Sequence, residues 1–187
     1  MQQIKGAVLK SRLAFVERQG GKRAVEQVLA SLPPDTQRTL RMLFTSNWYP
    51  FAIGRALDDA IVQVLGQGRS EYFEKLGEAS AETNLSTIHA SYLTRGDAHG
   101  FLAKSPSIYS LYYESGRREY QQTGPTEGVL TTYDAETFSA PDCLTVAGWY
   151  RKALEMCGVP GARITEEECR ARGGSVCRYR VRWGPGA

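Results

Sequence analysis

The chain contains 187 residues, of which 42% are hydrophobic and 23% are charged, and its formal net charge is +3. A chain of this length buries about two-thirds of the surface that its unfolded form exposes, so it reaches a stable size without disulfides or metals. The net charge is too small to indicate nucleic-acid binding. No apolar run approaches the roughly 18 residues of a membrane span, and residues 1–10 lack the apolar stretch of a secretory signal. We therefore expect one cytoplasmic domain over residues 1–187, with no membrane span and no bound nucleic acid.

The first half of the chain has a helical pattern. Apolar residues such as Ile53, Leu57 and Ile61 recur at steps of four, which predicts amphipathic helices over residues 4–104. Glycine and proline cut this half into short helices. The predicted breaks are Gly20-Gly21, Pro33-Pro34, Pro50, residues 66–68 and Arg95-Gly96, with Asp35 and Ser70 as helix caps.

After Pro106 the pattern changes to a period of two, which is typical of strands. A single helix interrupts the strands, with Ser139 as its cap. The predicted elements are strands at 107–113, 117–123 and 128–133, the helix at 141–156, and strands at 163–171 and 176–183. The fold class is therefore α+β, with a helical N-terminal half, an antiparallel meander sheet, a long helix and a C-terminal hairpin.

The last predicted strand has two distinct faces. Cys177 shares one face with apolar residues, and we expect that face to point into the core. Arginines occupy the other face, which we interpret as the solvated side of an edge strand. The arginines are Arg178, Arg180 and Arg182.

Two of the four cysteines flank the final hairpin. Cys169 and Cys177 each lie four residues from Gly173, so antiparallel pairing places them opposite each other, with Cβ atoms about 4.5 to 5.5 Å apart. That separation suits two ligands of one tetrahedral zinc ion. A disulfide is disfavoured in a cytoplasmic protein.

A third sulfur ligand must come from the helix that precedes the hairpin. Cys143 and Cys157 are 14 residues apart, or about 21 Å along a helix, so they cannot share one ion. The geometry does not choose between them, nor among residues 166–168 for an oxygen ligand. Strand parity with Cys169 favours Glu167. The alternative to a metal site is a set of buried core cysteines.

The glutamate run before Cys169, with Cys177 eight residues later and Cys143 upstream on a helix, resembles the zinc-binding 4-vinyl-reductase domain. That domain is also the sensor of phenol-responsive transcriptional activators. The resemblance implies Cys143, Glu166, Cys169 and Cys177 as zinc ligands. Glu166 and Cys169 point to opposite faces of a regular strand, so this ligand set requires a bulge between them. Four protein ligands leave no open position, which indicates a structural zinc ion.

The chain starts with residues 4–8, which are followed by a predicted helix and Gly20-Gly21. This start is similar to that of proteins in the wider superfamily of haem nitric-oxide-binding domains and Bet3-type trafficking subunits. The resemblance extends to stand-alone myxobacterial relatives. Tyr113, Ser115 and Arg117 match the pattern with which haem sensors hold the haem propionates. His89 and His99, 24 and 14 residues before Tyr113, provide no secure axial ligand. We interpret the motif as a turn and do not expect haem.

Aromatic residues suggest a site for a small apolar or aromatic molecule. The alternative is that these residues belong to the core. The candidate pocket residues are Trp48, Phe51, His89, Tyr92 and Trp149.

No phosphate-binding glycine motif or nucleophile elbow is present in the sequence, so we do not expect an enzyme. The sequence predicts a regulatory or sensory module with a structural zinc ion. Its effector is expected to be a small molecule, and its signal is expected to pass through a protein partner or a homodimer. The alternatives are a dimeric protein-protein adaptor without a ligand and a tetrapyrrole-related carrier or enzyme.

Overall fold

The computed structural model describes residues 2–87, 89–135 and 139–184. The helices are α1 (Gly6–Ala30), α2 (Pro34–Arg41), α3 (Phe51–Val64), α4 (Glu71–Leu85), α5 (Ala98–Ala103), α6 (Ser105–Tyr112) and α7 (Ala140–Met156), with 3-10 turns at Ala90–Tyr92 and Arg170–Arg172. The strands are β1 (Gln3–Lys5), β2 (Trp48–Pro50), β3 (Arg117–Gly124), β4 (Glu127–Tyr133), β5 (Arg163–Glu168) and β6 (Cys177–Arg182). The predicted α+β fold class is confirmed.

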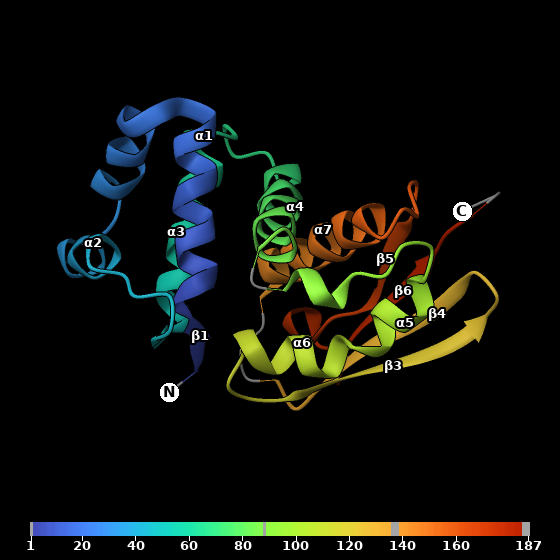
Figure 1. Ribbon diagram of the computed structural model, residues 1–187. Helices are drawn as coiled ribbons and strands as arrows, with labels where there is room; N and C mark the ends of the chain where they lie inside the picture. Colours follow the sequence, from blue (N-terminus) through green and yellow to red (C-terminus); the bar gives the residue numbers. More distant parts are fainter. Residues whose placement is uncertain (1, 88, 136–138, 185–187) are drawn as a thin grey trace.

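The helices form two groups joined by α4. Figure 1 shows α1, α2 and α3 on one side and α5, α6, α7 and the larger sheet on the other. Helix α4 lies between them and contacts both α1 and α7. Within the described residues, no helix is long and apolar enough to cross a membrane.

The larger sheet is antiparallel throughout, in the order β3-β4-β6-β5. Strand β6 is therefore an internal strand, which corrects the expectation of an edge strand. Its buried face carries Cys177, Tyr179 and Val181. The arginines of its other face form ion pairs with glutamates of the neighbouring strands, so the predicted arginine stripe is neutralised within the sheet. The pairs join Arg178 to Glu168, Arg180 to Glu127 and Glu167, and Arg182 to Glu127.

The strand predicted at 107–113 is wrong, because residues 105–112 form helix α6. Pro106 lies in the first turn of this helix, where the absence of a backbone N–H costs nothing. Ile108, Tyr109 and Tyr112 are buried, and their spacing places them on one helical face. The tyrosines and isoleucine that suggested a strand are thus core residues of a helix.

The remaining predicted elements after residue 113 agree closely with the structure. Strands β3 and β4 and helix α7 begin and end within one residue of the predicted bounds. Helix α7 has Ser139 as its N-cap, as predicted. The hairpin strand predicted at 163–171 ends earlier, at Glu168, because a 3-10 turn follows Cys169.

Candidate functional site

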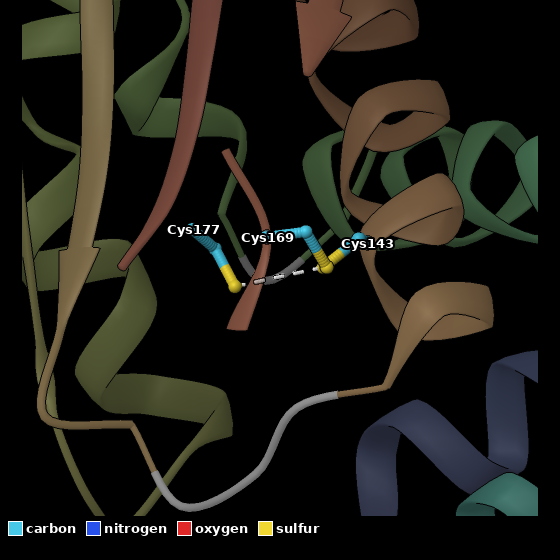
Figure 2. Close-up of side chains that lie close together, drawn as sticks. All are labelled: Cys143, Cys169 and Cys177. Atoms are coloured by element: carbon cyan, nitrogen blue, oxygen red, sulfur yellow. Dashed lines mark hydrogen bonds between the residues drawn. The ribbon is translucent and has the colours of Figure 1, made fainter. Parts of the chain in front are cut away.

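Three cysteine sulfurs meet where the start of α7 contacts the last hairpin. The Sγ of Cys143 lies 3.5 Å from that of Cys169 and 3.7 Å from that of Cys177, and all three lie within 4.8 Å of one another. Figure 2 shows the three side chains converging from α7, from the end of β5 and from the start of β6. In a tetrahedral zinc site with Zn–S bonds of about 2.3 Å, the sulfurs are about 3.8 Å apart. The cluster therefore has the spacing of a metal site.

Local backbone structure fixes each of these cysteines. The Ser139 Oγ accepts a hydrogen bond from the Asp142 N–H at 3.1 Å, which places Cys143 in the first turn of α7. The carbonyl of Cys169 accepts a hydrogen bond from the Gly174 N–H, and this turn passes through Gly173 at a φ of 88°. A positive φ favours glycine, so Gly173 allows the tight return to Cys177.

Glu166 interacts with Cys169, although its oxygens do not lie within 4.8 Å of all three sulfurs. The register of β5 against β6 shifts between Glu166 and Glu168, which is the bulge that the implied ligand set requires. The Glu166 side chain is 12% exposed, and its Oε2 pairs with Arg172. Its Oε1 is buried and has no hydrogen-bond partner in the described chain. A buried oxygen without a donor costs free energy, so this atom fits a missing cation.

The other two glutamates of the run have partners elsewhere. Glu167, which strand parity favoured, pairs with Arg180. Glu168 accepts hydrogen bonds from the N–H and Oγ of Ser175 and from Arg178. Both carboxylates thus hold the hairpin together and are directed away from the sulfurs.

The hydrogen bond between Cys143 and Cys177 shifts the pKa values of the two thiols in opposite directions. A hydrogen bond from Cys143, together with one from the Arg170 N–H, lowers the pKa of Cys177 to about 6. The same hydrogen bond and burial raise the pKa of Cys143 well above its usual range. A lowered pKa favours the thiolate of Cys177, which is the form that binds metal ions. Cys157 is fully buried at the other end of α7 and does not belong to the cluster.

A cavity of about 50 Å³ lies between α1, α4, α6, β3 and α7. Of the five predicted pocket residues, only Trp149 lines it. Trp48 is a residue of β2, and its ring lies beneath the ammonium group of Lys5. Phe51 is buried at the start of α3. The rings of His89 and Tyr92 contact each other at 5.6 Å. The structure therefore does not gather the five residues into one pocket.

Two polar residues of the cavity wall, Arg118 and Tyr112, were not among the site residues predicted from the sequence. Arg118 and Tyr112 are 6% and 7% exposed, and both line the cavity. Tyr112 lies in the segment that was predicted as a strand. Arg118 lies between the exposed residues Arg117 and Glu119, and the alternation of strand faces is the signal that could have placed it inside.

The motif of Tyr113, Ser115 and Arg117 does not converge on the cavity. Tyr113 lines the cavity, and its Oη donates a hydrogen bond to Asp142 at 3.2 Å. Arg117 is exposed and pairs with Glu119 and Asp134. Ser115 is held at the turn, where its carbonyl accepts a hydrogen bond from a tyrosine hydroxyl.

A family model described as "Protein of unknown function (DUF2378)" matches residues 49–184. The chain belongs to this family. The DUF2378 match contains all three clustered cysteines and Glu166. No curated protein matches the sequence significantly.

Solved structures of H-NOX proteins share the fold of this DUF2378 chain. A mutant from K. algicida, described as Fe(II) unliganded, matches at 14% identity with a TM-score of 0.74 and covers 97% of both chains. A protein from S. oneidensis in the Fe(II)NO ligation state matches at 14% identity with a TM-score of 0.71, over 97% of this chain and 99% of that one. A mutant H-NOX protein from T. Tengcongensis matches at 13% identity with a TM-score of 0.72, over 98% and 100%.

These neighbours correct one expectation from the sequence. Haem was not expected, because neither His89 nor His99 provided a secure axial ligand. The fold is nevertheless that of H-NOX proteins, several of which are described by their Fe(II) state, and a further structural neighbour is described by its haem redox potential and porphyrin distortion. The lack of a recognisable ligand in the sequence was an insufficient reason to dismiss haem.

Proposed function

We propose that this chain is one cytoplasmic sensory or regulatory domain of the 4-vinyl-reductase type, in which a zinc ion joins the last hairpin to α7. The ligands are Cys143, Glu166, Cys169 and Cys177. The observation that carries this proposal is the convergence of three sulfurs within 4.8 Å of one another, and the buried Oε1 of Glu166, which has no hydrogen-bond partner among the described residues, supports it. Four protein ligands close the coordination sphere, so the ion has a structural role and activates no water.

The effector in this proposal is a small molecule with an apolar or aromatic body, bound in the cavity beside α7. Helix α7 supplies Cys143 at its start and Trp149 and Tyr150 further along, so one helix joins the metal site to the cavity wall. A ligand shifts a conformational equilibrium only by its difference in affinity for the two states. Zinc would hold one end of α7 fixed while the cavity responds.

Haem requires a separate test against these residues. Tyrosines and arginines line the cavity, and proteins use tyrosine as an axial ligand and arginine as a partner of carboxylates. The polar groups of the cavity wall thus suit the carboxylates of haem and offer a tyrosine as an axial ligand. Titration of the protein with haem, followed by absorption spectroscopy, tests binding directly.

Metal analysis tests the zinc site. We expect Cys169→Ser and Cys177→Ser to lose about one equivalent of zinc and to unfold at lower denaturant concentration, because metal binding contributes free energy to folding. Cys157→Ala is the matched control, since Cys157 is equally buried but lies outside the cluster. Full zinc content in both serine variants would contradict the site, and loss of zinc in Cys157→Ala would contradict the choice of the helical ligand.

The protein partner or second copy that receives the signal would bind an exposed apolar surface. Met42 and Phe44 are 72% and 63% exposed in the segment between α2 and β2. Exposed apolar side chains that lie close together are typical of interaction sites. The same observation favours the alternative of a dimeric adaptor. Light scattering of the native protein and of a Met42→Ser, Phe44→Ser variant tests whether a dimer forms through this segment.

A further inference from the structure

Arg118 is a buried arginine in the wall of the cavity. Its Nε donates a hydrogen bond to Thr132 Oγ1 at 2.9 Å, and its Nη1 donates one to Tyr150 Oη at 3.4 Å. Among the described residues, no carboxylate pairs with it. Burial of a charged side chain lowers stability unless an opposite charge pairs with it. A bound anion beside Arg118 would therefore stabilise its guanidinium.

The contrast with Arg12 shows that the deficit is specific to Arg118. Both arginines line the cavity and both are buried. The Arg12 guanidinium pairs with Asp58 Oδ1 at 2.8 Å and also donates to the Leu76 carbonyl at 2.9 Å. The nearby buried acid, Asp142, accepts its hydrogen bond from a tyrosine. Among the described residues, Arg12 therefore has a direct ion pair, whereas Arg118 interacts with the Asp142 carboxylate only at longer range.

Aromatic rings compensate the charge of Arg118 only in part. The guanidinium carbon lies 4.9 Å from the ring centroid of Tyr109 and 5.5 Å from that of Tyr150. Cation–π contacts of this kind are attractive, but they satisfy the ring-facing side of the guanidinium and not its N–H groups. Arg118 lines the cavity, and a guanidinium can donate to the two oxygens of a carboxylate.

A second polar atom of the same cavity also lacks a partner. The Tyr112 hydroxyl is buried and has no hydrogen-bond partner in the part of the chain that the structure describes. Most buried hydroxyls find a partner, so an unpaired one in a cavity wall indicates a missing acceptor or donor. The surrounding wall is largely apolar and includes Ile108, Val146 and Trp149.

We propose that this cavity binds a short-chain carboxylate, with the carboxylate on Arg118, a hydrogen bond from the Tyr112 hydroxyl, and the alkyl tail against the apolar wall. The size of the cavity limits the ligand. A water molecule needs about 10 to 15 Å³ of such space, so a cavity of about 50 Å³ accepts roughly four or five non-hydrogen atoms. Acetate and propionate are of this size, whereas hexanoate is too long. This inference rests on the proposed sensory function and narrows its effector to a short acid with an apolar body, because an aromatic ring exceeds this number of atoms.

Calorimetric titration of the native, zinc-replete protein at neutral pH provides the first test. The probes are acetate, propionate, butyrate and hexanoate, with propionamide as a neutral analogue of nearly the same shape. We expect propionate to bind at least about tenfold more tightly than propionamide, because a hydrogen bond to a charged group is worth this factor or more. We also expect hexanoate not to bind. Equal affinity for propionate and propionamide, or no binding by any short acid, would overturn the proposal.

Two variants locate the site. Arg118→Gln should weaken propionate binding by about tenfold to a hundredfold, whereas Arg117→Gln, on the neighbouring and exposed residue of the same strand, should leave it unchanged. Tyr112→Phe removes a hydroxyl that has no partner, so this variant keeps its packing and should bind propionate severalfold more weakly. If Arg118→Gln does not fold, the Tyr112→Phe variant and the comparison of propionate with propionamide still test whether the cavity binds a carboxylate. Unchanged binding in Tyr112→Phe together with unchanged binding in Arg118→Gln would overturn the assignment.

Zinc analysis of the same samples separates this inference from the proposed function. Full zinc content without carboxylate binding contradicts the ligand class and leaves the metal site standing. Carboxylate binding by a protein that contains no zinc contradicts the proposed metal site and supports the assignment of the cavity as a carboxylate site. Binding of phenol but of no carboxylate would support an effector site while overturning the assigned chemistry.

Discussion

Gly77 of α4 and Thr145 of α7 are in direct backbone contact. A Cβ atom at Gly77 would lie only 1.9 Å from the carbonyl oxygen of Thr145. One turn away the relationship is reversed, because a Cβ at Gly148 would lie 2.1 Å from the carbonyl oxygen of Glu74. The two helices therefore cross at glycines from both sides. Gly77 and Thr145 also line the cavity, so this crossing sets the spacing of its walls.

Gly77→Ala is expected to lower the free energy of unfolding by about 1 to 3 kcal/mol, because the new methyl group must push the helices apart. Gly54→Ala is the matched control. A Cβ at Gly54 meets the Leu9 side chain at 3.5 Å, which is ordinary contact, so alanine should be neutral or stabilising within α3. Denaturant unfolding of both variants checks this prediction, and equal stability of the two would contradict it.

Ser139→Ala should cost about 0.5 to 2 kcal/mol of stability, because it removes the cap hydrogen bond to the Asp142 N–H. Ser70 occupies the N-cap position of α4, but its side chain makes no cap hydrogen bond. Ser70→Ala is therefore expected to change the unfolding free energy by less than about 0.5 kcal/mol. Thermal or denaturant unfolding compares the two, and a larger loss in Ser70→Ala would show that the cap assignment is wrong.

Glu166→Gln should weaken zinc binding by at least about tenfold, since loss of even an outer-shell partner of a metal ligand has this effect. Glu167→Gln is the control, because each substitution removes one ion pair with an arginine, but Glu167 is directed toward Arg180. Competition with a chromophoric zinc chelator measures both affinities. A larger loss in Glu167→Gln would assign the oxygen ligand to the residue that strand parity favoured.

His89 should make stability depend on pH in mildly acidic solution. Burial lowers its pKa below the ordinary value of 6.5, so the unfolded chain takes up the proton at a higher pH than the folded chain. Its contribution is fully present above about pH 6.5 and is lost as pH falls through the folded-state pKa. His89→Phe keeps a ring against Tyr92 and Tyr112.

The free energy of unfolding should therefore fall more steeply between pH 7.5 and 5.5 in the native protein than in His89→Phe. Denaturant unfolding at both pH values measures this difference. An identical pH dependence in the two proteins would show that His89 titrates alike in the folded and unfolded chains.

The sequence predicted the elements whose signals are local. The cap at Ser139, the turn at Gly173 and the alternation along β6 are properties of a few consecutive residues, and the structure agrees with each. Helix α6 was missed because its short run of tyrosine, isoleucine and leucine satisfies the strand pattern and the helix pattern equally. Only packing against β3 and β1 distinguishes them.

The sequence by itself placed Cys169 and Cys177 on the two sides of one hairpin, because the turn at Gly173 lies midway between them, and the structure brings their sulfurs within 4.8 Å. The spacing of the cysteines did not choose between Cys143 and Cys157, whereas the family resemblance implied Cys143, and the tertiary structure places Cys143 beside the two hairpin cysteines. The tertiary structure also decided that, among the described residues, the Glu166 Oε1 has no hydrogen-bond partner and the buried Arg118 forms no direct ion pair. Such features depend on contacts between segments far apart in the chain, and no local pattern encodes the absence of a partner.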